Sequence, residues 1–434
     1  MKSQEIRAEQ LLELSLASGA SCAEVYQSTS LSRPIFFEAN RLKQLESCES
    51  EGTALRVWRN NRPGLAVAYG RIEPEELVET AIALSELNPL ETIELADSKT
   101  VVLPDLGEAV DVGELVKMGR EAIACIRDRY PDVLCSAELE CEQETISLTN
   151  SQGLHCRYTD ITLSGSLGVE WVRGEDFLGV YEDLEERDRL NVESLIRGIL
   201  IRLAWAQENT PPPVGDIPIL FTGKAATLFW DTVSEAINGK RVLEKSSPWS
   251  DRQGQLVVSE HLSLSQQPER GPYSCPFDDE GTNTQFLSLI QHGNLAQFYC
   301  DRATGRALRT VGTGNGFRPS LERYPTPELV NLVVEPGRGT LDELIHQLDR
   351  GLLVDQMLGG GSDISGDFSV NVDLGYRIDR GQIVGRVKDT MVAGNVYQAL
   401  ERVLALGGDN RWHGSCYTPS LIVEGLSVVG NIGM

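Results

Sequence analysis

Three consecutive prolines, Pro211–Pro213, constrain the fold of this chain more than any other feature of its sequence. Proline fixes its backbone φ angle and has no amide N–H to donate, so a run of three cannot lie inside a helix or a central strand. We therefore predict a linker over residues 208–216, between an N-terminal domain (residues 1–207) and a C-terminal domain (residues 217–434). A chain of 434 residues is long enough for two such domains.

The N-terminal half has the sequence pattern of an α+β domain. Short extended segments between residues 22 and 69, separated by turn residues, indicate an antiparallel meander. Longer extended runs between residues 133 and 182 indicate a second one. Each meander stands between two predicted helices, which hints at a helix–meander–helix unit used twice. The predicted helices span residues 4–18, 73–87, 111–130 and 190–207.

The C-terminal half has the pattern of a β-rich domain. A predicted strand at 217–221 is followed by a predicted helix at 225–238, and then by short strands separated by glycine-rich turns. Two further helices are predicted at 340–349 and 395–405. Many short strands of this kind are typical of a barrel-like or strongly curved sheet. The chain as a whole is thus predicted to be an α+β protein of two domains.

The composition limits the partners and the location of the chain. Its net charge is −25 at pH 7 and it has no basic stripe, so its surface is expected to repel the phosphates of nucleic acids. Nine scattered cysteines without CxxC spacing indicate neither a zinc ribbon nor a dense disulfide framework, and they fit a reducing compartment. The sequence shows no signal-peptide core and no run of about 18 apolar residues. We expect a soluble, cytoplasmic protein without membrane contact.

Three short motifs each allow two interpretations. Thr222–Lys224 follows a predicted strand but lacks other residues of a phosphate-binding loop, so a helix start is favoured. The acidic run Asp278–Glu280 could hold a hard cation, although a turn whose carboxylates face water or a basic partner is favoured. The glycines Gly359–Gly361 could let a ligand backbone approach closely or could form a flexible connection. None of the five histidines pairs with another at the spacing of a local two-histidine zinc site.

Several ordered motifs run along nearly the whole chain. They are residues 23–26 and 51–57, then 276–282 and 292–295, and finally 359–369, 392–395 and 419–421 before Gly430. These motifs resemble those of the TldD/PmbA metalloprotease family, whose members were once described as modulators of DNA gyrase. The run at 359–369 is the most specific of these. The resemblance extends to the two-domain layout, so it implies the same architecture as the sequence pattern.

The resemblance also implies that the zinc site of the family is missing here. Catalytic members carry HExxxH on the helix after the first strand of the second domain, and its His, Glu and second His correspond to Trp230, Asp231 and Glu235. Indole cannot ligate zinc, so we expect no catalytic residue and no metal in this chain. Cys416 matches the region of the family's C-terminal zinc-binding cysteine, and its role stays open. Asp231 and Glu235 share one helical face, so they could bind a different cation or face solvent or a partner.

This pattern resembles the PmbA/TldE-type subunit of the family. The resemblance implies a cytosolic heteromeric protease in which a TldD-type subunit supplies zinc and the general base, while this chain forms one wall of a peptide cleft. A homodimer is the alternative assembly. We expect peptides or unfolded segments, including peptide precursors, to bind as an added strand. The candidate substrate-binding residues are Gly359, Gly360, Gly361, Ser365, Gly366 and Asp367.

Two other classes of function stay open at this point. The chain could be a stand-alone metallopeptidase that uses ligands outside the family pattern. It could also be a protein-binding modulator, related to gyrase, without protease activity. The zinc content and the activity of the purified chain distinguish the first of these from a non-catalytic subunit.

Overall fold

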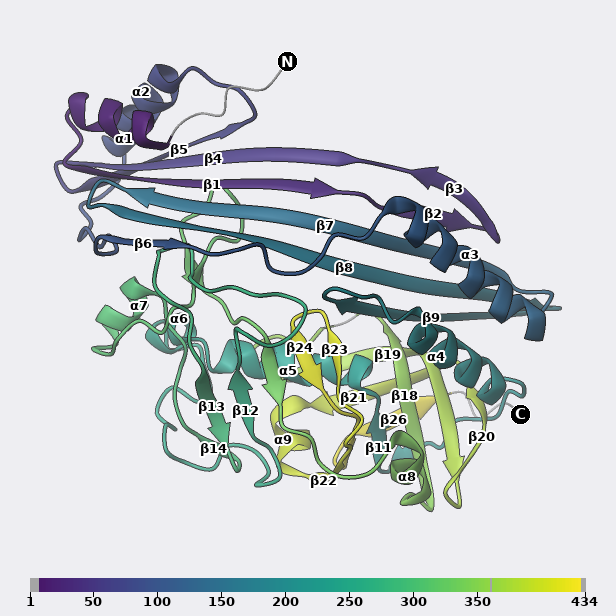
Figure 1. The fold of residues 1–434 in the computed structure, drawn as a ribbon. Coiled ribbons are helices and arrows are strands. Elements are labelled where there is room, and N and C mark those ends of the chain that lie inside the picture. Colours follow the sequence, from purple (N-terminus) through teal and green to yellow (C-terminus); the bar gives the residue numbers. More distant parts are fainter. Residues whose placement is uncertain (1–7, 360, 431–434) are drawn as a thin grey trace.

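The computed structural model describes residues 8–359 and 361–430, and it consists of two sheet-based halves that pack directly on each other (Figure 1). The first half is an antiparallel sheet with helices, and the second contains a strongly curled sheet, which confirms the predicted fold class. None of the helices within residues 8–359 and 361–430 has the length and apolarity that a membrane crossing requires.

One nine-stranded sheet organises the first half. Strands β1 and β2 lie end to end along one edge of β7, while β8 lies along its other edge. The first strands of the two predicted meanders therefore pair with each other, and the two predicted units share one sheet. The strands are β1 (Cys22–Ser32), β2 (Ile35–Glu38), β3 (Arg41–Leu45), β4 (Cys48–Arg59), β5 (Arg62–Tyr69), β6 (Lys99–Val102), β7 (Leu134–Asn150), β8 (Leu154–Arg173) and β9 (Asp176–Glu186).

Four helices pack on one face of this sheet, each within a few residues of its predicted position. They are α1 (Ala8–Ala17), α2 (Pro74–Ser85), α3 (Val112–Arg129) and α4 (Val192–Trp205). Helix α3 begins where the Asp111 side chain accepts a hydrogen bond from the Gly113 N–H. At Gly119 the helix comes so close to the sheet that a Cβ atom would lie 2.4 Å from the Phe37 ring. Helices α3 and α4 cover the β7–β9 end of the sheet, where Leu139 and Val180 point toward them.

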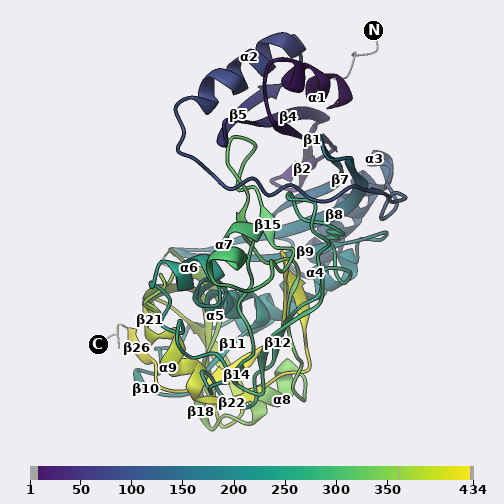
Figure 2. The ribbon, with the colours of Figure 1, turned by 90° about the vertical axis from the view of Figure 1, so that its left-hand side faces the viewer.

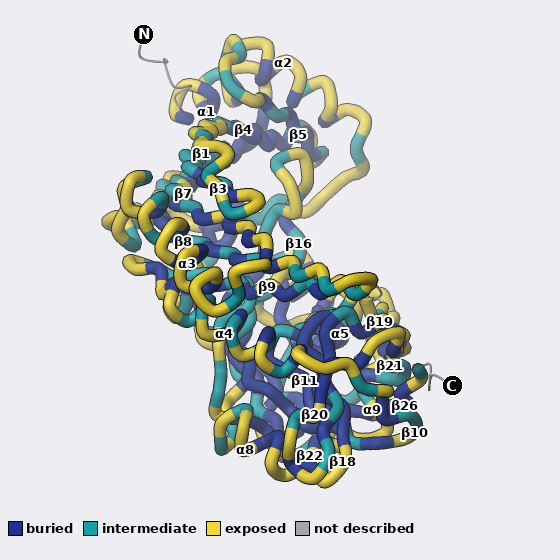
Figure 3. The backbone as a smooth tube through the Cα atoms, turned by 90° about the vertical axis from the view of Figure 1, so that its right-hand side faces the viewer, coloured by how far each residue is buried: buried dark blue, intermediate teal, exposed yellow. Residues whose placement is uncertain are grey.

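The second half contains a nine-stranded sheet that curls around helix α5 (Gly223–Ala236), whose inner side is buried (Figure 3). Phe221, Phe229 and Phe368 meet edge to face in the core between the helix and the sheet. The strands of this sheet are β10 (Gly215–Asp216), β11 (Ile219–Phe221), β18 (Arg350–Leu358), β19 (Asp367–Asp379), β20 (Gln382–Val387), β21 (Thr390–Asn395), β22 (Val403–Leu406), β25 (Leu421–Val423) and β26 (Ser427–Gly430).

A six-stranded sheet and a two-stranded ribbon complete the second half. The six strands are β12 (Leu264–Gln266), β13 (Leu287–Gln291), β14 (Asn294–Leu295), β17 (Leu332–Val334), β23 (Arg411–His413) and β24 (Cys416–Thr418). The ribbon pairs β15 (Gly316–Phe317) with β16 (Thr326–Pro327), and the loop between them reaches up to the first half (Figure 2). There the Tyr69 hydroxyl donates a hydrogen bond to Glu322.

Only some of the short helices of the second half were predicted from the sequence. They are α6 (Gly239–Leu243), α7 (Arg302–Ala307), α8 (Leu341–His346) and α9 (Val396–Glu401). Helices α6 and α7 were not expected from the sequence. The helix predicted at 395–405 is too long, because residues from Val403 onward pair with β25 as strand β22. Tertiary pairing overrides local helix propensity at this point.

Part of the segment 208–216, which is predicted to be a linker, packs against the protein, while Glu208, Asn209 and Pro211 are exposed. Pro212 and Pro213 are buried, and the Thr210 N–H donates to the Arg386 carbonyl. Gly215–Asp216 pairs with β26. The two halves also share one hydrophobic core, since side chains of α3 and α4 pack with buried residues of the second half such as Leu353 and Tyr376. The domain boundary itself stays a prediction.

Candidate functional site

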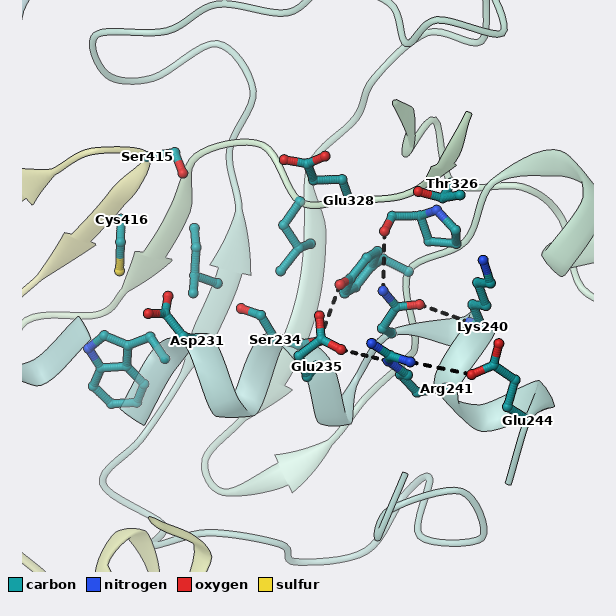
Figure 4. A pocket seen from close by; sticks show the side chains of 16 residues that line it. Asp231, Ser234, Glu235, Lys240, Arg241, Glu244, Thr326, Glu328, Ser415 and Cys416 are labelled. Carbon is teal, nitrogen blue, oxygen red and sulfur yellow. Dashed lines mark hydrogen bonds and ion pairs between the residues drawn. The ribbon is translucent and has the colours of Figure 1, made fainter. Parts of the chain in front are cut away.

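The outward side of α5 lines a pocket of about 560 Å³, shown in Figure 4 and called here the α5 pocket. Side chains from α5, α6, the β16–β17 region and β24 converge on it. Its lining residues are Trp230, Asp231, Ser234, Glu235, Asn238, Lys240, Arg241, Glu244, Tyr299, Thr326, Pro327, Glu328, Leu329, Leu332, Ser415 and Cys416. The structure thus brings Cys416 close to the three predicted motif positions on α5, although Cys416 is far from them in the sequence.

Trp230 is a structural side chain at the base of the pocket. It is 1% exposed, and its indole Nε1–H donates a hydrogen bond of 2.6 Å to the hydroxyl oxygen of Thr418 on β24. The ring also packs near Phe229 in the core of the second half. Since indole has only this one polar group, and it is already a donor to protein, Trp230 offers no electron pair to a cation.

Asp231 and Cys416 lie next to each other at one end of the pocket, with their side chains pointing toward one another (Figure 4). Asp231 reaches the open side of the pocket, yet the surrounding protein raises the pKa of its carboxyl by desolvation. Burial raises the pKa of the Cys416 thiol, and the nearby Asp231 charge raises that pKa further. A thiol shifted in this direction stays protonated at neutral pH, and a protonated thiol is a poor nucleophile.

Glu235 is already engaged by a cation of the protein. Its carboxylate lies 2.6 Å from Nε of Arg241, and Nη1 of the same guanidinium lies 3.4 Å from Glu244. Within the described part of the chain, no three His, Cys, Asp or Glu side chains are grouped so that they could hold a metal ion. The donor set of the α5 pocket therefore does not fit a zinc site of the family's kind, because it offers no imidazole and only one thiol.

The predicted substrate-binding residues lie outside the lining of the α5 pocket. Gly359 and Gly361 are on the surface beyond the end of β18, and Gly360 lies outside the described residues. Ser365–Asp367 is held by Asn395, whose side-chain amide donates to the Ser365 carbonyl and to Asp367. Their role in peptide binding stays a prediction.

A buried charge network at the start of α5 could not be found from the sequence. Lys224 lies 3.6 Å from Glu182 and 3.5 Å from Asp355, and Arg202 lies 2.9 Å from Asp355. The two cations hold the pKa of Asp355 well below its usual range. Thr222–Lys224 is thus a helix start, as predicted, with Thr222 as the N-cap. Because the four charged residues come from β9, α4, α5 and β18, no local motif marks them.

The acidic run Asp278–Glu280 forms the predicted turn, but its side chains do not face solvent as expected. Asp278 is 1% exposed and accepts hydrogen bonds from the N–H groups of Thr282 and Gly316, at 2.8 and 2.9 Å. Backbone donors replace the water that the carboxylate loses on burial. Desolvation raises the pKa of Asp279 to about 6 and that of Glu280 to about 7.

Comparison with known proteins gives both sequence and structural relatives. The family model described as PmbA/TldA metallopeptidase C-terminal domain matches residues 214–430, and the model described as PmbA/TldA metallopeptidase domain 1 matches residues 23–85. A Haemophilus influenzae protein named metalloprotease PmbA homolog is 24% identical over 446 aligned positions. That alignment covers 97% of this chain and 94% of the relative.

Two solved structures have the same fold along nearly the whole chain. TldE from Thermococcus kodakarensis superposes with a TM-score of 0.88 at 23% identity, covering 97% of this chain and 99% of that one. A candidate modulator of a DNA gyrase from Thermotoga maritima superposes with a TM-score of 0.85 at 21% identity, with the same coverage. At these identities the likeness establishes the fold.

Proposed function

The chain belongs to the PmbA/TldD metallopeptidase family, and from this premise we propose that it is the non-catalytic subunit of a zinc metalloprotease complex that acts on peptides or unfolded segments. The observation that carries the proposal is the buried Trp230, which is hydrogen-bonded to Thr418. It stands where the catalytic members are expected to place a zinc-binding histidine. Because the one polar group of this side chain joins α5 to β24, Trp230 cannot also bind a metal ion.

The rest of the α5 pocket supports the same proposal. Glu235 is paired with Arg241, and the Cys416 thiol is kept protonated by burial and by Asp231. A stand-alone peptidase would need three convergent ligands and a base, and this donor set does not supply them. We therefore infer that the pocket corresponds in position to the family's site, while the polar groups that line it make contacts within this chain.

In this proposal the catalytic chemistry comes from a TldD-type partner, and the present chain contributes a wall of the peptide cleft. Gly359, Gly361 and Ser365–Asp367 remain the candidate substrate-binding residues of this wall. A homodimer is the alternative assembly. We place the complex in the cytoplasm, because nine scattered cysteines without CxxC spacing are typical of a reducing compartment.

The test is a reconstitution with matched variants. The proposal expects no peptide hydrolysis by this chain alone and chelator-sensitive hydrolysis after a TldD-type subunit is added. Replacing both Asp231 and Glu235 with Ala should leave the activity of the complex nearly unchanged. A loss above about 100-fold with assembly intact, which equals about 2.7 kcal/mol of transition-state stabilisation, would assign them a direct catalytic role and contradict the proposal.

A further inference from the structure

Helices α3 and α4 begin close together, because the two connections that lead to them leave the same stretch of β8. Leu106 forms a bridge with Asp160 of β8, and β9 ends opposite Leu163 of the same strand. From there both connections cross to the helical face of the sheet (Figure 1). The N-cap residues Asp111 of α3 and Asn191 of α4 consequently line one common pocket of about 850 Å³.

This pocket, called here the α3–α4 groove, runs along one side of α3. Its lining positions on that helix recur every three or four residues, which is the spacing of a single stripe on a helix. The stripe extends from Asp111 to Cys125, a length of about 20 Å at the rise of a helix. The lining residues are Glu108, Ala109, Val110, Asp111, Glu114, Met118, Glu121, Ala122, Cys125, Asp188, Arg189, Leu190, Asn191, Val192, Glu193 and Ile196.

The floor of the groove is apolar. Val110, Met118 and Ile196 pack against the hydrophobic core under the two helices, yet each is only partly buried and keeps surface toward the groove. Ala122 and Leu190 are buried beside them. An apolar surface of this kind with a polar rim is typical of a site of protein interaction.

The rim of the groove is strongly acidic. Helix starts account for part of this charge, because Asp111 caps α3 while Glu114 and Glu193 lie in first turns, where a negative charge is favourable. The other three carboxylates lie outside these first turns, and the single basic residue of the lining is Arg189. The six carboxylates of the rim are Glu108, Asp111, Glu114, Glu121, Asp188 and Glu193.

These rim carboxylates are almost free of partners of opposite charge. Among the ion pairs of residues 8–359 and 361–430, one involves the rim, between Glu121 and Lys117 at 3.9 Å. Both of its side chains are about two-thirds exposed or more, so the pair contributes little. The groove therefore combines an apolar floor with an uncompensated negative rim.

The shape and charge of the groove indicate which kind of segment fits it. A helix lying along α3 covers about 20 Å with three to four turns, and apolar residues at every third or fourth position all face the floor. Lysine or arginine residues that flank this apolar stripe then lie beside the rim carboxylates. An extended strand instead turns every second side chain away from the floor.

We propose that the α3–α4 groove binds a basic amphipathic helix of a partner protein. The apolar floor and the complementary charge of the rim carry this assignment. The groove shares no lining residue with the α5 pocket. The proposal therefore does not depend on zinc chemistry or on the proposed protease role, and the two can fail independently.

Two labelled peptides of identical composition, each of about 15 residues, test this proposal with the full chain. The helical peptide has leucines on one helical face and lysines on both flanks, and the reference peptide alternates leucine with lysine. Fluorescence anisotropy should show at least about tenfold tighter binding of the helical peptide, since the apolar stripe of the reference forms only in an extended chain.

Cys125 reports whether the peptide occupies the groove. Its exposed thiol lies at the end of the α3 stripe, whereas the exposed Cys48 lies on β4 outside the groove. A saturating amount of the helical peptide should slow the alkylation of Cys125 by at least about fivefold and leave that of Cys48 unchanged, because only the groove is covered.

Matched charge reversals test the role of the rim. Glu114→Lys/Glu121→Lys should weaken binding of the helical peptide about tenfold, because attraction becomes repulsion at two places. Glu75→Lys/Glu79→Lys makes the same change on exposed positions of α2, also beginning in a first turn, and should stay within about twofold of the wild type.

Unchanged far-UV circular dichroism shows that both double variants are folded. No binding, equal binding of the two peptides, equal weakening by the two variants, or unchanged alkylation of Cys125 would each overturn the proposal.

Discussion

Trp230 on α5 and Thr418 on β24 are joined by a buried hydrogen bond of 2.6 Å from the indole N–H to the hydroxyl oxygen. This bond links the helix inside the curled sheet to the strand that leads out of Cys416. It lies at the position where the resemblance to the family predicts the first zinc-binding histidine.

Breaking the Trp230–Thr418 contact should destabilise the second half. Trp230→Phe keeps most of the buried ring but removes the donor, so we expect a loss of about 1–2 kcal/mol in the free energy of unfolding. Denaturant titration measures this loss. In a double-mutant cycle with Thr418→Val, the coupling should be about 1 kcal/mol. A coupling near zero would show that the hydrogen bond contributes nothing to stability.

Cys416 should resist alkylation at neutral pH, because its raised pKa leaves little thiolate. The exposed Cys48 and Cys125 provide internal controls in the same sample, mapped by mass spectrometry. Asp231→Asn removes the negative charge that helps to raise the thiol pKa, so it should speed the modification of Cys416. Rapid labelling of wild-type Cys416, ahead of the two exposed cysteines, would contradict the assigned environment.

Glu280 should make stability depend on pH between about 4.5 and 7. Its folded-state pKa is raised to about 7 by burial, so the folded protein binds a proton that the unfolded chain releases nearer its ordinary value. The stabilising contribution is therefore full below the unfolded pKa and is lost as pH rises through the folded pKa. Relative to wild type, Glu280→Gln should become more stable as pH rises from 5 to 8, by on the order of 2 kcal/mol.

Denaturant titrations across this pH range measure that difference. The exposed Glu79→Gln on α2 is a matched control, since the same chemical change there should give a nearly constant difference from wild type. If Glu280→Gln instead lost stability relative to wild type as pH rose, the carboxyl would be ionised and favourably paired in the folded state.

The segment 208–216 should resist limited proteolysis, because two of its prolines are buried and its backbone pairs with β20 and β26. The core shared between the halves should also make them unfold together. Digestion with a broad-specificity protease, followed by mass spectrometry, locates the first cut. An early cut within 208–216 that leaves two stable fragments would show that the halves are independent domains.

The sequence allowed the fold class and the first-half helices to be predicted, because amphipathic periodicity and capping residues such as Asp111 are local signals. The resemblance to the family also pointed to Trp230, Asp231 and Glu235, which line the α5 pocket. Other features depend on long-range pairing. Val403 was predicted in a helix, but it pairs with β25 as part of strand β22. The burial of Asp278 was not predicted, because one of its backbone donors, Gly316, lies 38 residues away in the sequence.

The charged groups were the hardest part of the site to predict. Lys224, Glu182, Arg202 and Asp355 meet only when four elements have packed, and each looks like an ordinary surface residue in the sequence. The ion pair between Glu235 and Arg241 was missed although the two residues are close in sequence, because helix α6 was not anticipated.

We propose that this chain serves a catalytic partner and does no metal chemistry itself. The most direct test of this proposal is one peptidase assay, run with the purified chain alone, with a TldD-type subunit alone, and with the two mixed, each with and without a chelator. The account predicts no hydrolysis and no stoichiometric zinc for this chain alone, and chelator-sensitive hydrolysis for the mixture above that of the partner alone. Robust chelator-sensitive hydrolysis by the present chain alone, with about one bound zinc per chain, would contradict it.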